Sequence, residues 1–304
     1  MPSPQRLTPL TILLLVVPPL LWAGNAVVGR LVRELVSPLT LNFVRWVIAF
    51  VLLLPLAAPV LRPASPLWAH WKRYALLGLL GLLGIGLYNA FQYLALQTST
   101  PINVTLVGSS LPLWMLAVGS LFFGARPHAR AIGGALLSML GVLLVLSRGE
   151  WRQLLALRLV PGDLYMILGT IAWAFYSWLL ARTHEPAALR RDWAAFLMAQ
   201  LVFGIAWSGA LAAGEWTLTP AHLDLGWPLV AAMAFIGIGP AVLAYRCWGT
   251  GVQRAGPQVA GIFMNLTPLF AAVMSAAFLR EAPHWYHGAA FVLIVGGIVV
   301  STRR

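Results

Sequence analysis

Two tryptophans occupy matching places in the two halves of this 304-residue chain, and each precedes a second side chain able to bind a ligand. Trp22 is followed about one helical turn later by Asn25, and Trp173 by Tyr176. Indole and phenol rings accept apolar or aromatic groups and still offer a hydrogen-bonding edge. The spacing indicates the wall of a cavity for small amphipathic molecules. Lipid packing and an interfacial aromatic belt are the alternative interpretations.

Uncharged polar side chains inside apolar segments form a second group with binding chemistry. In a membrane such groups are costly unless they face protein or water, so they mark either contacts between helices or a path for a solute. The predicted substrate-binding set joins them to the aromatic residues: Trp22, Asn25, Tyr88, Gln92, Ser109, Trp114, Trp173, Tyr176 and Asn265. Arg45 also falls inside an apolar segment, where snorkelling or pairing with a backbone carbonyl would account for it.

The apolar segments lack the groups that catalysis, metal binding and proton transfer require. All eight acidic residues map to loops or span ends, whereas proton-driven carriers usually keep an ionisable group within the membrane. Cys247 is the single cysteine, the His residues show no paired spacing inside a span, and no nucleotide-binding loop occurs. We therefore predict no enzyme activity, no catalytic residue, no metal and no cofactor. Uncoupled transport is the simpler hypothesis, although backbone or water could still coordinate an ion.

The composition of the chain places these residues in a membrane. Hydrophobic residues make up 60% of it and charged residues 9%, and a soluble protein could not bury so much apolar surface. At roughly 20 residues per span, the chain accommodates about ten helices and no soluble domain. The formal charge of +12 comes from loop residues rather than from a basic patch. We expect the lipid bilayer as a partner and no nucleic acid.

Apolar segments separated by short polar loops predict ten transmembrane helices in an all-α membrane protein. The predicted spans are Leu10–Gly29, Pro38–Ala58, Tyr74–Leu96, Pro101–Phe123, Ala129–Ser147, Gly162–Ala181, Trp193–Ala213, Trp227–Trp248, Pro257–Leu279 and Trp285–Val300. The first span resembles a signal peptide. We retain it because its Trp22-Ala23 recurs as Trp173-Ala174 in the sixth span, and a removed leader has no reason to match a retained helix.

The sequence repeats itself at a constant offset of 156 residues, which relates Pro101–Arg148 to Pro257–Arg304. The matching positions include Pro112/Pro268, Pro127-His128/Pro283-His284, Gly141/Gly297 and Arg148/Arg304. A repeated hydrophobic chain is typical of a secondary transporter. Because each half has five spans, an odd number, the second half must enter the membrane in the opposite sense. We predict two inverted five-helix repeats, residues 1–150 and 151–304, with the substrate between them near the bilayer midplane.

Proline and glycine within four of the spans predict flexible points. Proline in a helix removes a backbone hydrogen bond, and small residues permit close approach or bending. The predicted hinge residues are Gly84, Gly86, Pro112, Gly239, Pro240 and Pro268. Static kinks and close helix packing are the alternative explanations.

Lys and Arg are distributed unevenly between the two sides of the predicted spans. With the N-terminus on the cytoplasmic side, the richer side holds Arg6, Arg62, Lys72, Arg73, Arg126, Arg130, Arg182, Arg190, Arg191, Arg246, Arg254, Arg303 and Arg304. Since cytoplasmic loops carry the excess of basic residues, we predict that both termini are cytoplasmic.

The repeat unit resembles a known family. Gln92–Thr98, followed by Pro101 and Leu111–Leu113, resembles the unit of the drug/metabolite transporter (DMT) superfamily, in its ten-helix EamA-type branch. Leu266–Leu269 with Glu281 is similar to the same unit, and its acidic residue is absent from the first copy. Tryptophan content and size are most similar to bacterial amino acid exporters of the YddG kind.

The resemblance implies a multi-pass protein of a bacterial inner (plasma) membrane that exports amino acids, including aromatic or hydrophobic ones, by alternating access. Its partner would be a small-molecule substrate, and a monomer is compatible with the pattern. A proton-coupled drug or metabolite exporter, a lipid flippase and an intramembrane enzyme are the competing hypotheses. The enzyme would need clustered carboxylates, a Ser/His pair or metal ligands at membrane depth, which the sequence lacks.

Overall fold

The computed structural model describes residues 7–62, 65, 71–99, 101–155, 160–182, 192–279 and 284–302. Within these ranges all secondary-structure elements are helices. The sole β-type pairing in the described residues is an isolated bridge between Val36 and Leu223. Nine helical segments of the described chain are long and apolar enough to cross a membrane. A further helical segment, Pro257–Leu279, is interrupted by a short 3-10 turn. The predicted all-α membrane fold is confirmed.

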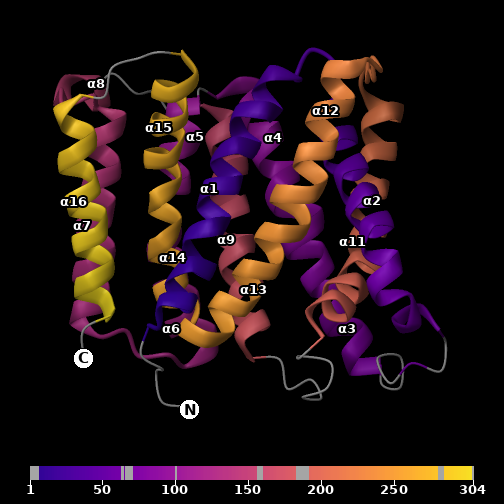
Figure 1. The fold of residues 1–304 in the computed structure, drawn as a ribbon, viewed down its shortest axis with the longest axis horizontal. Helices are drawn as coiled ribbons and strands as arrows, with labels where there is room; N and C mark the ends of the chain where they lie inside the picture. Colours follow the sequence, from indigo (N-terminus) through magenta and orange to yellow (C-terminus); the bar gives the residue numbers. More distant parts are fainter. Residues whose placement is uncertain are drawn as a thin grey trace.

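The membrane-spanning segments of the first half, some of them made of two helices, run alternately up and down the bundle (Figure 1). Their helices are α1 (Pro9–Leu31), α2 (Pro38–Ala57) with the 3-10 turn Ala58–Leu61, α3 (Trp71–Leu80) continuing through a π-helix (Gly81–Leu87) into α4 (Tyr88–Thr98), α5 (Pro101–Gly108), α6 (Leu111–Phe123) and α7 (Ala129–Leu146). The short helix α8 (Trp151–Leu155) follows and leads into the second half.

The second half repeats this order of elements with the opposite direction at the start (Figure 1). Its helices are α9 (Pro161–Arg182), α11 (Trp193–Leu218), α12 (Trp227–Ile236) continuing through a π-helix (Gly237–Leu243) into α13 (Ala244–Ala255), α14 (Pro257–Phe263) with the 3-10 turn Met264–Leu266, α15 (Thr267–Leu279) and α16 (Trp285–Thr302). The beginning of α1 and the end of α16 lie at the same end of the bundle.

Two helices extend past their predicted ends. The seventh span continues to Leu218 instead of Ala213, and the eighth continues to Ala255 instead of Trp248. In α13 the polar residues fall on one face, while Trp248 and Val252 are fully buried on the other. Hydropathy averaged around the helix falls there, but the inward face remains apolar, so the helix continues.

The two halves meet through corresponding helices. α7 packs along α16, and α2 packs along α11. Where α7 and α16 cross, a Cβ built on Gly134 would stand 2.5 Å from the carbonyl oxygen of Gly297, and a Cβ on Gly297 would stand 2.5 Å from that of Gly134. Only glycine permits this backbone approach. The same pairing of halves brings α4 against α9 and α1 against α13.

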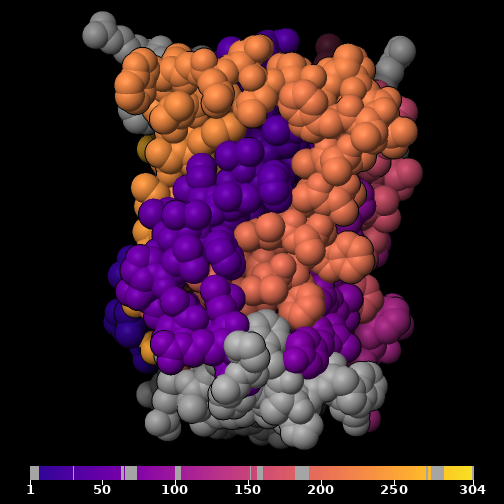
Figure 2. Space-filling view, turned by 90° about the vertical axis from the view of Figure 1, so that its right-hand side faces the viewer, coloured from indigo at the N-terminus to yellow at the C-terminus, as the bar shows by residue number. Residues whose placement is uncertain are grey.

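The outer surface of the bundle is apolar. Figure 2 shows the face on which α2, α11 and α12 lie side by side. Val51, Trp207 and Val230 are exposed on these helices. In water such a surface would associate, whereas in a bilayer it faces lipid tails.

Candidate functional site

A π-helix interrupts both the third and the eighth span at equivalent positions. The N–H of Tyr88 bonds to the carbonyl of Leu83, and the N–H of Ala244 bonds to that of Gly239. These longer i→i+5 bonds replace the usual helical bonds. Pro240 contributes to the interruption in the eighth span, because it has no N–H to donate.

The next carbonyl in each π-helix accepts a hydrogen bond from an aromatic side chain of another helix. The Tyr245 hydroxyl donates to the carbonyl oxygen of Gly84. The Trp22 indole Nε1 donates to that of Pro240, at 3.1 Å. Each interruption therefore orients one buried ring. These rings come from α1 and α13, which pack together.

Seven buried rings from five helices meet in the interior, and we call them the central aromatic cluster. Its members are Trp22, Trp46, Tyr88, Trp173, Tyr176, Tyr245 and Trp248. Trp173 lies at its centre and is fully buried. Its ring centroid lies 5.2 Å from that of Trp22, edge to face, and 4.7 Å from that of Tyr88.

The cluster depends on a glycine for space. A Cβ on Gly84 would stand 2.6 Å from the Tyr176 ring, so the ring packs directly on the backbone of the π-helix. Tyr176 in turn lies 4.9 Å, centroid to centroid, from Trp173. The indole Nε1 of Trp173 has no hydrogen-bond partner among the described residues. A buried N–H without a partner is uncommon.

A hydrogen-bond network runs beside the cluster and is centred on Arg45, which is 0% exposed. Its Nη1 donates to Asn89 Oδ1 at 2.8 Å and to the Tyr93 hydroxyl at 3.2 Å. Tyr93 donates onward to Asn25 Oδ1 at 3.0 Å. The guanidinium carbon lies 4.8 Å from the centre of the Trp46 ring. Complete burial excludes the snorkelling that the sequence left open, and side chains rather than backbone carbonyls hold Nη1.

The structure brings together part of the predicted substrate-binding set. Trp22, Tyr88, Trp173 and Tyr176 belong to the central aromatic cluster, and Asn25 belongs to the adjacent network. Gln92 is half-buried on α4.

Three predicted residues make separate contacts. Ser109 Oγ donates to the Leu106 carbonyl at 2.6 Å, and Trp114 Nε1 donates to Ser110 Oγ at 3.1 Å. Asn265 Nδ2 donates to Ser138 Oγ on α7 at 2.8 Å. None of these bonds reaches the central aromatic cluster.

The predicted hinge residues lie at or next to the helix interruptions. Gly84 and Gly86 are in the first π-helix, and Gly239 and Pro240 are in the second. Pro112 and Pro268 are each the second residue of a helical segment, α6 and α15, and the helix breaks just before them. Proline is compatible with the first turn of a helix, where its missing N–H has no role.

Three members of the central aromatic cluster are absent from the predicted substrate-binding set: Trp46, Tyr245 and Trp248. Trp46 follows Arg45 and is far from either end of its span, so an interfacial belt cannot explain it. Trp248 is the last residue of the predicted eighth span, whereas in the structure it is fully buried within α13. Its position after Tyr245, one helical turn on, repeats the pattern of Trp173 and Tyr176.

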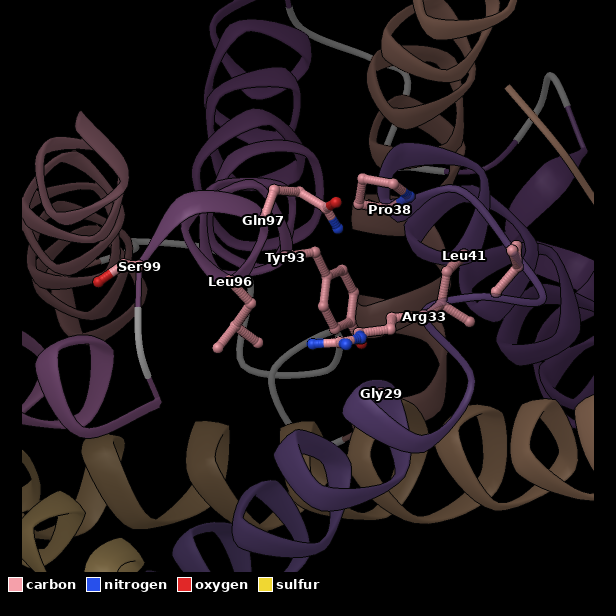
Figure 3. Close-up of a pocket in the computed structure, with 9 residues that line it drawn as sticks. Gly29, Arg33, Pro38, Leu41, Tyr93, Leu96, Gln97 and Ser99 are labelled. Carbon is pink, nitrogen blue, oxygen red and sulfur yellow. The ribbon is translucent and has the colours of Figure 1, made fainter. Parts of the chain in front are cut away.

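Two pockets lie outside the central aromatic cluster, and neither is lined by a predicted substrate-binding residue. A pocket of about 60 Å³ lies where α1 ends and α2 begins, and Tyr93 projects among its lining residues (Figure 3). A larger apolar pocket of about 840 Å³ lies between α1, α14, α15 and α16, with Phe263, Phe270 and Phe291 among its walls.

Carboxylates occupy helix ends in the described chain. Asp192 caps α11, and Asp163 lies in the first turn of α9. Glu215 lies in the last turns of α11 and accepts hydrogen bonds from the first turn of α2. Within the described part of the chain, the exposed side chains of Arg33 and Glu34 form an ion pair.

A family model matches this chain twice, over residues 9–147 and 160–303, and it is that of the EamA-like transporter family. The chain belongs to the EamA-like transporter family. Membership of this family makes it a transporter and a multi-pass membrane protein. This membership agrees with the apolar helices and with a small-molecule substrate, and it indicates a non-enzymatic role.

Relatives of this EamA-like chain include uncharacterized transporters and a transporter whose substrate is named. An uncharacterized transporter of Archaeoglobus fulgidus is 25% identical and covers 97% of this chain and 98% of its own. The aromatic amino acid exporter YddG of Ancylobacter novellus is 27% identical over 80% of this chain and 78% of its own. A solved crystal structure matches with a TM-score of 0.72 at 22% identity over 95% of both chains, a likeness of fold alone.

Proposed function

We propose that this protein exports amino acids, above all aromatic and hydrophobic ones, by alternating access across a bacterial inner membrane. The two halves act as inverted repeats with both termini in the cytoplasm. The central aromatic cluster binds the side chain of the substrate, and the π-helices and the breaks before Pro112 and Pro268 bend as the halves rock. One relative with a named substrate, an aromatic amino acid exporter, supports this substrate class.

The observation that carries the proposal is the composition of the central aromatic cluster. Rings from α1, α2 and α4 of the first half interleave with rings from α9 and α13 of the second. Movement of one half against the other would separate Trp22 from Trp173 and open an aromatic chamber. Edge-to-face contacts between rings are worth about 0.5–1.5 kcal/mol each beyond burial. An aromatic substrate replaces these contacts when it enters, which reduces the cost of opening.

The transport step needs no proton relay in this proposal. Asp163, Asp192 and Glu215 accept hydrogen bonds from backbone N–H groups at helix ends, and none of these donors belongs to the central aromatic cluster. Because no carboxylate of the described residues bonds to the central aromatic cluster, movement in this proposal follows the concentration gradient of the amino acid.

Counterflow in liposomes tests the proposal. Protein reconstituted into vesicles loaded with unlabelled tryptophan, phenylalanine or leucine should accumulate the labelled amino acid, and the rate should be the same within about twofold with and without a pH gradient. Trp173→Ala should abolish the exchange because it removes the central ring. An absence of flux for every amino acid would refute the substrate class, and strict dependence on the gradient would refute the uncoupled mechanism.

A further inference from the structure

Arg45 is a buried cation, and only one of its three side-chain nitrogens donates hydrogen bonds to the described residues. It is 0% exposed, and both of its hydrogen bonds, to Asn89 and Tyr93, come from Nη1. Nε and Nη2 are buried and have no hydrogen-bond partner in the part of the chain that the structure describes. An unpaired buried charge costs several kcal/mol. The hydrogen bonds to Asn89 and Tyr93 satisfy Nη1 and leave the donors of Nε and Nη2 unsatisfied.

The two free nitrogens define the shape of the missing partner. A guanidinium presents its donors in a rigid planar fork that matches a carboxylate through two parallel hydrogen bonds. Nε and Nη2 lie on the same edge of the group, the edge away from Nη1. Because Nη1 is fixed by Asn89 and Tyr93, this edge is held in one orientation. A planar anion such as a carboxylate fits it, whereas a single-point acceptor would leave one donor unused.

The guanidinium of Arg45 lies next to the central aromatic cluster. The guanidinium stacks on Trp46, whose ring lies 4.9 Å, centroid to centroid, from that of Tyr245. Asn89, which accepts from Arg45, also donates to the Tyr245 hydroxyl at 3.5 Å. A molecule with its ring in the cluster would therefore have a cation within reach of a carboxylate attached a few bonds away.

Tyr93 connects Arg45 with the surface. Its hydroxyl accepts from Arg45, and its ring lines the 60 Å³ pocket at the end of α1 (Figure 3). The ring packs on Gly29, where a Cβ would stand 3.2 Å from it. Displacement of this one ring would open a path from the pocket to the Nη1 side of Arg45.

We propose that Arg45 is the carboxylate-binding residue of this transporter, and that it selects amino acids over the corresponding amines by a bidentate hydrogen bond from Nε and Nη2. The inference rests on the proposed function, because it assigns a role within the same site. The ammonium group of the substrate would lie against the faces of the aromatic rings, which attract cations.

A comparison of tryptophan with tryptamine tests this role, because the two differ only in the carboxylate. Affinities come from titrating the rise in unfolding temperature of the purified protein with each compound. A charge-assisted hydrogen bond is worth roughly 1.5–3 kcal/mol, so the unaltered protein should prefer tryptophan by about 10- to 150-fold. In Arg45→Gln that preference should fall to near one, through weaker tryptophan binding and unchanged tryptamine binding.

Two further variants make the test specific. Arg45→Lys keeps the charge but loses the planar fork, so it should retain an intermediate preference; it also carries the test if Arg45→Gln does not fold. Arg246→Gln is the matched control, since Arg246 is exposed and stacks over Trp193 at 4.4 Å. It should leave the preference unchanged.

The outcomes separate this inference from the proposed function. If tryptophan binds and is exchanged but Arg45→Gln and Arg45→Lys keep the full preference, the assignment of Arg45 is wrong and amino acid export stands. If the unaltered protein binds tryptamine as tightly as tryptophan, the assignment is again wrong. If it neither binds nor exchanges any amino acid, both proposals fail.

Discussion

Gly84 shows how much a single residue contributes to the site. Its missing side chain lets the Tyr176 ring rest on the backbone, and its carbonyl accepts the Tyr245 hydroxyl. Gly237 fills a comparable role in the other half, where a Cβ would stand 2.5 Å from Ile48. Both residues combine close packing with a position inside a π-helix, and bending at these positions stays a prediction.

Gly84→Ala should destabilise the protein and slow exchange. The added methyl group would meet the Tyr176 ring at 2.6 Å, and overpacking of this kind costs about 1–3 kcal/mol. A lower thermal unfolding temperature in detergent and a lower counterflow rate would report it. Gly133→Ala is the control, because a Cβ at Gly133 meets no atom within 4 Å. Equal unfolding temperatures for the two variants would contradict the packing argument.

At the scale of residues, the sequence indicated which aromatic residues belong to the site better than it indicated which residues contact one another. Trp22 and Trp173 stand out because they recur in the two halves, and this repetition survives in the fold. In the sequence Arg45 is recognisable only as a cation within an apolar segment, because its partners Asn89 and Tyr93 lie 44 and 48 residues away. Such pairs depend on how α2 packs on α4, which hydropathy does not specify.

The start of α2 illustrates how one helix completes another. Ser37 occupies the N-cap position but makes no side-chain capping bond. Glu215 of α11 replaces it: its carboxylate accepts from the N–H of Leu39 at 2.9 Å, and from the N–H and hydroxyl of Thr40 at 2.8 Å each. A carboxylate at a helix N-terminus also interacts favourably with the helix dipole. This contact joins the two halves at one end of the bundle.

Glu215→Ala should lower the free energy of unfolding by about 1–3 kcal/mol, because buried N–H groups would lose their acceptor. Glu215→Gln keeps one acceptor oxygen and should lose less. Thermal unfolding of the purified protein measures both. Glu34→Gln is the matched control, since Glu34 is exposed and pairs with Arg33 at the surface, and such pairs contribute about 0–1 kcal/mol. A similar loss in Glu34→Gln and Glu215→Ala would argue against the capping role.

Helix positions followed closely from hydropathy, and the interruptions within them did not. Pro38, Pro101, Pro257 and Trp285 begin helices at the residues expected from sequence. The glycines and prolines of four spans marked the places where interruptions occur, but their form, a π-helix or a short 3-10 turn, depends on which neighbour accepts or donates the displaced hydrogen bonds. Trp22 and Tyr245 supply those bonds from other helices.

At the scale of the whole molecule, corresponding features recur at the offset of 156 residues that the sequence contains. The two π-helices begin at Gly81 and Gly237, and the later breaks precede Pro112 and Pro268. A substitution at one of these features in one half, with the corresponding feature of the other half left intact, therefore offers a way to study opening toward one side of the membrane at a time. The repeat predicted this symmetry, while the dense packing of rings at its centre required the structure.

The central claim is that the aromatic cluster opens alternately to the two sides of the membrane, and thiol labelling at Ser177 tests it most directly. Ser177 is fully buried on α9, where it accepts from Trp248 and donates to the Trp173 carbonyl, and serine to cysteine is a conservative change. Replacement of the single native cysteine by Cys247→Ala leaves one reactive position in Ser177→Cys. A membrane-impermeant thiol reagent should label this position both in intact cells and in inside-out vesicles, and tryptophan should slow both reactions. Labelling from one side only, or from neither, would contradict alternating access through this cluster.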